Sequence, residues 1–404
     1  MRILHTADWH LGDRLGRIDR TDHIRRAVER VRDYCLSRQV DVLVVAGDLF
    51  SERCRSDHLR DAVAHLRNTF HEFLTGGGAI VAITGNHDNE TFCRTLKHVM
   101  DLAAPGVARP GSLVPPGRFY LAPAPTFLRL QDRQGVEVQF VLLPYPTEQR
   151  YLKDDAQKYA SLGEKHQALH AACLDALRKM TQHPNFRADC RTVLAAHLHV
   201  RGAELAHLFR ITPEEDILFQ ATDLPTDWDY IALGHIHRPQ FITAPHIRYC
   251  GSIERLDLGE KDDAKSVTLF EIGKDGVVGD FEFLPLDATP FMDVEISDPK
   301  VDLPRWKEMF PEGNDALVRC LVGYQRGTDD LGAIVRELHG IFPHCYAVDA
   351  RPAGEAGSPN GEAMLSLDAV RENVLSYLTQ QLQEQSNRSA VLALAEKLLA
   401  GEAR

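Results

Sequence analysis

The sequence contains no C-x-x-C pair, although it has eight cysteines among its 404 residues. Cysteines scattered in this way argue against a zinc ribbon and give no sign of a disulfide framework. No apolar run approaches the ~20 residues that a membrane-spanning helix needs. The apolar run after Met1 is short and soon meets Asp8, so we expect no secretory leader. These absences predict a reduced, cytoplasmic protein that does not enter a membrane.

An excess of positive charge is also missing. Lys and Arg total 46 against 58 Asp and Glu, which gives a formal net charge of −12. A nucleic-acid partner would therefore have to be bound by local basic patches or through metal ions. The hydrophobic content of 44% is that of an ordinary globular protein, and the length allows two or three domains. Nineteen histidines are more than expected, which favours metal binding.

Hydrophobic periodicity predicts an α/β protein. Apolar strands alternate with amphipathic helices in the N-terminal quarter of the chain, which favours a mostly parallel sheet. The expected strands there are 2–6, 40–46 and 79–84, and the expected helices are 21–35, 59–73 and 92–102. Proline and glycine between Pro105 and Pro125 predict a loop-rich crossover. Further on, the expected strands are 136–143, 192–196, 230–233, 266–272 and 279–284, with a helix at 162–180.

Composition also divides the chain into parts. We expect a first domain of residues 1–285, a small α/β domain of 286–352, a linker of 353–365 and a helical tail of 366–404. The tail pattern gives two amphipathic helices that are too short to be stable alone in water. They must therefore pack on their own chain or bind a partner.

Five segments share one pattern, an apolar strand that ends in side chains able to bind a metal ion. Alternate residues of an extended chain face the same way, so closely spaced pairs can point into one cleft. Strand ends of this kind lie at the carboxyl edge of a sheet, where α/β proteins bind ligands. The candidate ligands are Asp8, His10, Asp48, Asn86, His197, His235 and His237.

Carboxylate, imidazole and amide ligands suit Mn²⁺, Fe or Zn. Seven ligands are too many for one ion, but they suit two ions ~3.5–4 Å apart that share a carboxylate, as in phosphatases and nucleases. A single histidine at a strand end is more often an ordinary polar residue, so the inference depends on the five segments together. Beside Asn86, His87 can donate a proton or contact developing charge, and Asp88 can hold its ring.

These segments resemble the five motifs of the calcineurin-like metallophosphoesterases. The stretches 1–12, 46–50 and 251–260 further resemble the SbcD family, the nuclease subunit of SbcCD-type DNA repair complexes. The resemblance covers the predicted first domain and implies a four-layer αββα sandwich with a small capping domain. It also implies a double-strand DNA exonuclease with single-strand endonuclease activity that uses two divalent ions, usually Mn²⁺.

The resemblance implies a role for each site residue. One ion would take Asp8, His10, Asp48 and His237, and the other would take Asp48, Asn86, His197 and His235, with Asp48 bridging. His87, held by Asp88, would protonate the leaving oxygen or stabilise the reacting phosphoryl group.

Substrate contacts are expected from basic residues near the ligands. The candidates are Arg14, Arg17, Arg53, Arg55 and Arg255, together with His199. For the first four, a solvated surface beside acidic neighbours is an equal alternative. His199 is an extra histidine beside His197, for which we expect a contact with substrate or solvent. Ser51 stands where relatives often have Asp or His, which leaves its role open.

The resemblance implies two protein partners. A homodimer would use the apolar sides of helices 59–73 and 92–102, for which core packing is the alternative. An SbcC-type coiled-coil ATPase would bind the helical tail. Two other functions stay open: a phosphodiesterase or monoesterase for nucleotides or other small phosphoesters, which fits the acidic charge, and a non-catalytic DNA-binding scaffold. A missing ligand would favour the scaffold, but all seven ligands and His87 are present.

Overall fold

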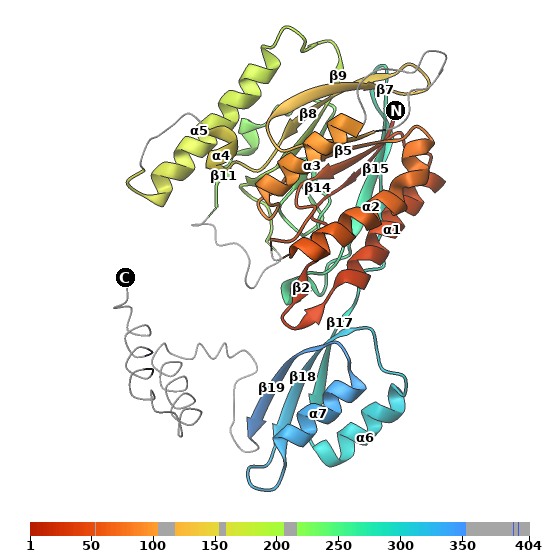
Figure 1. Ribbon diagram of the computed structural model, residues 1–404, viewed down its shortest axis with the longest axis vertical. Helices are drawn as coiled ribbons and strands as arrows, with labels where there is room; N and C mark the ends of the chain where they lie inside the picture. The colour runs from red at the N-terminus through yellow and green to blue at the C-terminus, as the bar shows by residue number, and fades with distance from the viewer. Residues whose placement is uncertain are drawn as a thin grey trace. The chain divides into compact units, whose positions relative to one another are not determined.

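The computed structural model describes residues 1–52, 54–103, 118–152, 159–205, 216–352, 391 and 395. Figure 1 shows these residues coloured along the chain. The predicted linker 353–365 and all but two residues of the predicted tail 366–404 lie outside the described residues.

The first β-sheet has six strands in the order β16-β15-β1-β4-β5-β6. Strands β1, β4, β5 and β6 run parallel, and β15 and β16 form an antiparallel hairpin beside β1. The bounds are β1 Arg2–Thr6, β4 Val42–Ala46, β5 Ala79–Ile83, β6 Phe119–Ala122, β15 Ser266–Gly273 and β16 Gly276–Pro285. The expected parallel sheet is therefore confirmed, except that β6 lies in the segment 105–125 that we expected to be loop.

The second β-sheet also has six strands, in the order β13-β14-β12-β9-β8-β7. Its centre is parallel, and β7 and β13 pair antiparallel at the two edges. The bounds are β7 Thr126–Gln131, β8 Glu137–Leu143, β9 Arg191–His197, β12 Tyr230–Gly234, β13 Gln240–Ile242 and β14 Ala244–Tyr249. The periodicity did not reveal β7, β13 and β14, because these strands are short or only partly buried and so give a weak alternation.

The two sheets pack face to face. Val44 and Val81 of the first sheet share one buried core with Phe140, Ala195 and Tyr230 of the second. Each central strand is buried on both faces, which explains why β4 and β5 read as continuous apolar runs.

Helices cover the outer face of each sheet, as Figure 1 shows. A second core joins α1 (Thr21–Ser37), α2 (Ser56–Thr75) and α3 (Glu90–Ala103) to the first sheet. A third core joins α5 (Leu162–Thr181) to the second sheet. The order helix, sheet, sheet, helix confirms the αββα architecture. No helix in the described ranges is long and apolar enough to cross a membrane.

Short elements connect these layers. They are the strands β2 Arg14–Leu15, β3 Ile18–Asp19, β10 His199–Val200 and β11 Leu218–Phe219, the helix α4 Glu148–Tyr151 and the 3-10 turns Ala221–Asp223 and Leu258–Glu260. Strands β2 and β3 form a hairpin directly after the first candidate ligands.

A third sheet follows in the chain, with three strands in the order β17-β18-β19. Its elements are β17 Phe291–Ile296, α6 Pro299–Met309, β18 Leu317–Tyr324, α7 Leu331–Ile341 and β19 Cys345–Pro352. These alternating strands and helices lie within residues 286–352, for which the sequence predicted a small α/β domain. Residues 1–322 and 330–350 together form one compact unit, so the domain boundary expected at 286 stays a prediction.

The apolar side of α2 packs in the core of the protein. Leu66, Phe70 and Phe73 are buried in the core between the helices and the first sheet. On α3, Leu96 packs partly on the same core, whereas Leu102 is 83% exposed. Core packing therefore accounts for most of the apolar surface that suggested a dimer interface, and the homodimer stays a prediction.

Replacing Leu66 by alanine should lower the free energy of unfolding by about 2–5 kcal/mol, because it leaves a cavity in a packed core. Leu102→Ala is the matched control on α3 and should change the free energy by no more than about 0.5 kcal/mol. Chemical denaturation of both variants measures the difference. A large effect at Leu102 would show that the end of α3 is buried in an assembly.

Candidate metal centre

The candidate ligands follow strands of both central sheets. In the first sheet, Asp8 comes after β1, Asp48 after β4 and Asn86 after β5. In the second sheet, His197 ends β9 and His235 follows β12. Because β1, β4 and β5 are parallel neighbours, as are β9 and β12, these strand ends meet at one edge of the two sheets.

The backbone is unusual at these strand ends. Six non-glycine residues of the described chain have a positive φ, and four of them are candidate ligands. Their φ values are 51° for Asp8, 47° for His10, 50° for Asp48 and 98° for His235. This conformation costs free energy in residues with a side chain and tends to occur at functional sites. The fold therefore maintains local strain where the ligands lie.

Glycines allow the strand ends to approach one another. A Cβ atom at Gly85 would lie 2.1 Å from Oδ1 of Asp48, and one at Gly47 would lie 2.1 Å from Nδ1 of His197. Gly47 also has a φ of +97°, which side chains rarely adopt. These positions need glycine because a neighbouring ligand occupies the space of a side chain.

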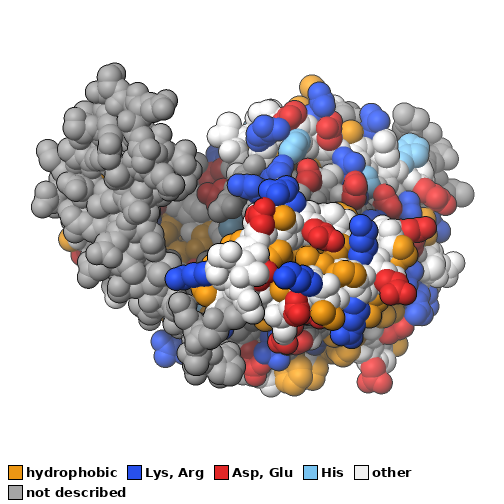
Figure 2. Space-filling model, turned by 90° about the horizontal axis from the view of Figure 1, so that it is seen from below, with side chains coloured by type: hydrophobic (Ala, Val, Ile, Leu, Met, Phe, Trp, Pro, Cys, Tyr) orange, Lys and Arg blue, Asp and Glu red, His pale blue; other side chains and the backbone are white. Residues whose placement is uncertain are grey.

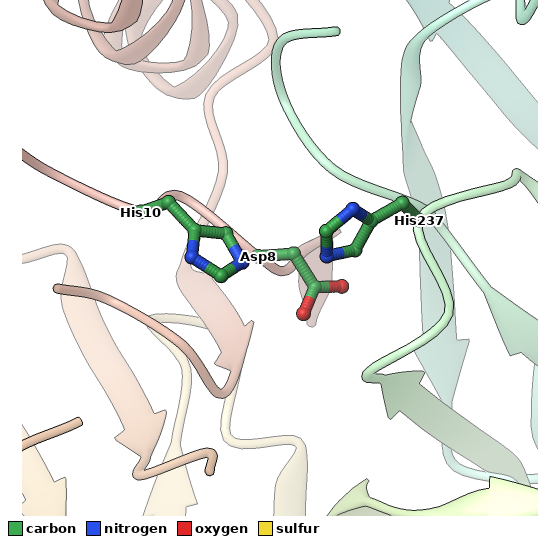
Figure 3. Close-up of side chains that lie close together, drawn as sticks. All are labelled: Asp8, His10 and His237. Atoms are coloured by element: carbon green, nitrogen blue, oxygen red, sulfur yellow. The ribbon is translucent and has the colours of Figure 1, made fainter. Parts of the chain in front are cut away.

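One group of ligands contains Asp8, His10 and His237 (Figure 3). Their nearest nitrogen and oxygen atoms all lie within 4.8 Å of one another. The figure shows the Asp8 carboxylate between the two imidazole rings, whose centroids are 5.1 Å apart. Asp8 and His10 are almost completely buried.

A second group is formed around Asp48. Its Oδ2 atom lies 3.4 Å from Nε2 of His197 and 3.5 Å from Nε2 of His10. The Asn86 Oδ1 atom lies 3.0 Å from Nε2 of His197 and 3.0 Å from Nδ1 of His235. Asp48 thus lies between the two groups, as a bridging ligand would. The seven candidates converge in a way that fits the two expected ligand sets.

Hydrogen bonds fix two of the histidine rings from behind. His197 donates from Nδ1 to the Ala46 carbonyl at 2.8 Å, so its Nε2 atom faces Asp48. His235 donates from Nε2 to the Asp216 carboxylate at 2.6 Å, so its Nδ1 faces Asn86. Such hydrogen bonds select the tautomer and the ring orientation that a metal ligand needs.

The third ring has a carboxylate partner as well. His237 donates from Nδ1 to Oε1 of Glu260 at 2.8 Å, which leaves Nε2 for the centre. Neither Asp216 nor Glu260 was among the site residues predicted from the sequence. Glu260 ends the segment 251–260 that resembles the SbcD family, so a signal existed for it. Asp216 follows two glutamates, a run that reads as a solvated surface.

The electrostatics of the centre connect Asp48 with His197. Burial favours the neutral carboxyl group, but the adjacent His197 and His10 hold the pKa of Asp48 well below its usual range. Burial also favours the neutral imidazole, yet Asp48 and Asp8 raise the pKa of His197 to about 9. Burial raises the pKa of Asp8. Without an ion, the His197 ring is therefore positively charged at neutral pH.

The donor set fits a pair of divalent ions. Two aspartates, one amide oxygen and four imidazoles are present, and Asp48 lies where it can be shared. Oxygen and imidazole ligands without thiolates suit Mn²⁺, Fe or Zn. The ligand assignment itself stays a prediction.

His87 lies beside the centre and is partly open to solvent. Its ring centroid is 5.0 Å from that of His10, and its side chain is 28% exposed. Nδ1 of His87 lies 3.6 Å from the carboxylate of Glu52. The ring can therefore reach a group that sits on the centre without being part of it.

Asp88 does not hold the His87 ring in the expected way. Its carboxylate accepts hydrogen bonds from the backbone N–H groups of Leu49, Phe50 and Gly85. Burial, and then repulsion from Asp48, raises the pKa of Asp88 to about 6. Asp88 therefore joins the loop after β4 to the loop after β5, and its role is to position loops.

Two of the expected substrate contacts make hydrogen bonds within the fold. His199 is 4% exposed and donates from Nδ1 to Asp216 at 3.0 Å. Arg255 donates to the backbone carbonyls of Ala288, Thr289 and Asp263. These bonds give both side chains a place in the scaffold, and their role as substrate contacts stays a prediction.

The other basic candidates lie at the surface. Arg14 is partly exposed and donates to the Arg17 carbonyl, within the β2–β3 hairpin. Arg17 is exposed, and the Arg55 side chain is 72% exposed beside Asp57. Arg53 lies outside the described residues. Ser51 donates its hydroxyl hydrogen bond to Asp13, and both residues are buried.

Comparison with known proteins identifies the class. Residues 1–239 match the family described as calcineurin-like phosphoesterase. Because this match covers more than half of the chain, the protein belongs to the calcineurin-like phosphoesterase family. The fold and the candidate ligands accordingly describe a metal-dependent phosphoester hydrolase.

Within this family, the chain is similar to nuclease subunits from two bacteria. The chain is 30% identical over 285 residues to the SbcD subunit of the nuclease SbcCD from Bacillus subtilis, which covers 67% of this chain and 66% of that protein. It is 28% identical over 330 residues to the protein of the same name from Escherichia coli, covering 77% and 76%. These matches confirm the resemblance to the SbcD family.

A solved structure, a dimetal phosphatase from Danio rerio, covers 71% of this chain and 99% of that one, at 11% identity and a TM-score of 0.39. That similarity is too distant to support a conclusion about function.

Metal binding at pH 7.5 should release about one proton from His197, because an ion needs the neutral ring. The release should fall towards zero as the pH rises through about 9, the pKa of His197 in the metal-free protein. Titration calorimetry of Mn²⁺ binding in buffers of different ionisation enthalpy measures this number. Proton release that does not change across this pH range would show that His197 is neutral before the ion binds.

Proposed function

We propose that this protein is a Mn²⁺-dependent DNA nuclease of the cytoplasm, with double-strand exonuclease and single-strand endonuclease activity. It would work with an SbcC-type coiled-coil ATPase in DNA repair and recombination. The observation that carries the proposal is the convergence of seven candidate ligands in a chain similar to nuclease subunits over most of its length.

In this proposal one ion is held by Asp8, His10, Asp48 and His237, and the other by Asp48, Asn86, His197 and His235. Bound ions of this kind polarise a phosphoryl oxygen and lower the pKa of the attacking water. The chain itself supplies the fixed ring orientations and His87. From its partly exposed position, His87 would protonate the leaving oxygen or stabilise the charge on the phosphoryl group.

DNA would be bound by local basic groups. On the face in Figure 2, the coloured residues show acidic and basic side chains interspersed, without a continuous basic stripe. The exposed Arg17 lies at the turn of the β2–β3 hairpin, which follows His10 after only a few residues. Arg14, Arg17, Arg53 and Arg55 are the proposed phosphate contacts, and a small number of contacts predicts a modest salt dependence.

The proposed substrate is tested against the small phosphoester alternative. Purified protein with Mn²⁺ is given linear duplex DNA or a small phosphate bis-ester at equal metal concentration. The proposal expects degradation of the duplex with poor turnover of the bis-ester. The reverse preference would establish a phosphodiesterase for small molecules, and no hydrolysis of either would favour a scaffold.

His87→Ala should keep both ions while the cleavage rate falls ~10²–10⁴-fold, the usual cost of losing one general acid. Asp48→Asn is the contrasting variant, because removal of the bridging charge should weaken both ions together. Elemental analysis after gel filtration, beside a cleavage assay, separates the two effects. Loss of metal from His87→Ala would show that His87 is a ligand.

Deletion of residues 366–404 tests the proposed role of the tail. If the tail binds the ATPase, the truncated protein should stay folded and still cleave short DNA with Mn²⁺. It should no longer co-purify with its SbcC-type ATPase, because amphipathic helices of this kind bind as helices laid into a groove. Precipitation of the truncated protein would instead indicate that the tail packs on its own chain.

A further inference from the structure

We propose that two buried carboxylates, Asp216 and Glu260, each control the binding of a different metal ion. Asp216 would act by positioning His235, and Glu260 by positioning His237. These two histidines belong to different predicted ligand sets. The inference presupposes the metal centre proposed above and assigns two positioning residues to it.

Four hydrogen bonds fix the Asp216 carboxylate. Oδ2 accepts from Nε2 of His235 at 2.6 Å and from Nδ1 of His199 at 3.0 Å. Oδ1 accepts from the Tyr145 hydroxyl at 3.0 Å and from the Ile217 backbone at 2.8 Å. Asp216 is only 7% exposed, so water does not compete for these bonds. His235 cannot rotate its ring without losing a charge-assisted bond.

The contact between Asp216 and His235 is a hydrogen bond, although His199, Asp216 and His235 lie close enough together to suggest another ion. An ion bound to both a carboxylate and an imidazole at about 2.1 Å in octahedral geometry places neighbouring ligand atoms about 3.0 Å apart. The observed 2.6 Å is shorter. His199 therefore supports Asp216 through a hydrogen bond to the same oxygen, Oδ2.

Glu260 is fixed as firmly, through other residues. Oε1 accepts from Nδ1 of His237 at 2.8 Å. Oε2 accepts from the Lys265 ammonium at 2.6 Å, the Ser252 hydroxyl at 3.0 Å and the Leu256 backbone at 3.3 Å. Lys265 also donates to the backbone carbonyl of His237 at 2.8 Å. One buried lysine thus stabilises both the backbone of His237 and the carboxylate that holds its ring.

The His197 ring differs from those of His235 and His237, because its hydrogen-bond acceptor is not a carboxylate. His197 is held by the carbonyl of Ala46, a neutral acceptor that adds no charge. A carboxylate acceptor both orients an imidazole and makes it a more basic ligand, and its removal typically costs 10–100-fold in metal affinity. Asp216 and Glu260 have different hydrogen-bond donors, so their effects should be independent.

Calorimetric titration of Mn²⁺ into the metal-free protein, without DNA, tests the assignment. Asp216→Asn and Glu260→Gln keep the side-chain size but replace an accepting oxygen by an NH₂ group. Each should weaken one of two ions about 10–100-fold, and the double variant should weaken both. Circular dichroism of the metal-free variants checks that they are folded.

Two ligand variants tell which ion each carboxylate controls. In His10→Ala, the remaining ion is the one bound through His235, so Asp216→Asn should weaken it and Glu260→Gln should change it less than about twofold. In His197→Ala, the two effects should be exchanged. If Glu260→Gln does not fold, because Lys265 loses its main partner, Glu260→Asp keeps the charge but shortens the reach, and should weaken the same ion.

Some results would overturn the assignment. If the wild-type protein binds two ions and the two substitutions weaken both ions equally, or neither, Asp216 and Glu260 do not act on separate ions. A folded wild-type protein that binds no Mn²⁺ would overturn the metal centre, and this inference with it.

Discussion

Two aspartates, Asp8 and Asp48, are almost completely buried where the ends of the two sheets meet. Each charge is costly to bury, and the two repel each other, so the centre requires positive charge close by. In the metal-free protein His197 provides it, which explains the raised pKa of this ring. Divalent ions would provide it more strongly. The remaining candidate ligands surround the two aspartates, where they can hold such positive charge close to both carboxylates.

This requirement sets narrow limits on the backbone. Side chains from two sheets can share an ion only if their strand ends approach within a few ångströms. Gly47 and Gly85 allow this approach, and Asp8 and Asp48 adopt positive φ values at these strand ends. Such strained residues persist only where the surrounding structure over-determines them. The core between the sheets, which contains Val44 and Tyr230, provides that rigidity.

Around the candidate ligands, buried charged side chains form hydrogen-bond networks in place of apolar packing. Asp216 and Glu260 each accept several hydrogen bonds, and Lys265 is buried among carboxylates. Burial of charged groups is acceptable because every one of these is paired. Because these groups are buried, they add no positive charge to the molecular surface. The chain as a whole has a formal net charge of −12. A DNA substrate would therefore be attracted mainly by the ions and a few arginines.

The sequence by itself indicated a mostly parallel α/β sheet and pointed to the seven candidate ligands, and its resemblance to a known family implied the αββα layers. Local periodicity marks the central strands β1, β4 and β5, and parallel strands bring their carboxyl ends to one edge, so a candidate ligand such as Asp48 can be located from the sequence alone. Only the tertiary structure decided that Asp216 holds His235, that Arg255 binds backbone carbonyls and that Leu66 belongs to the core. Contacts between residues far apart in the chain leave no periodic signal, because they depend on how the layers pack.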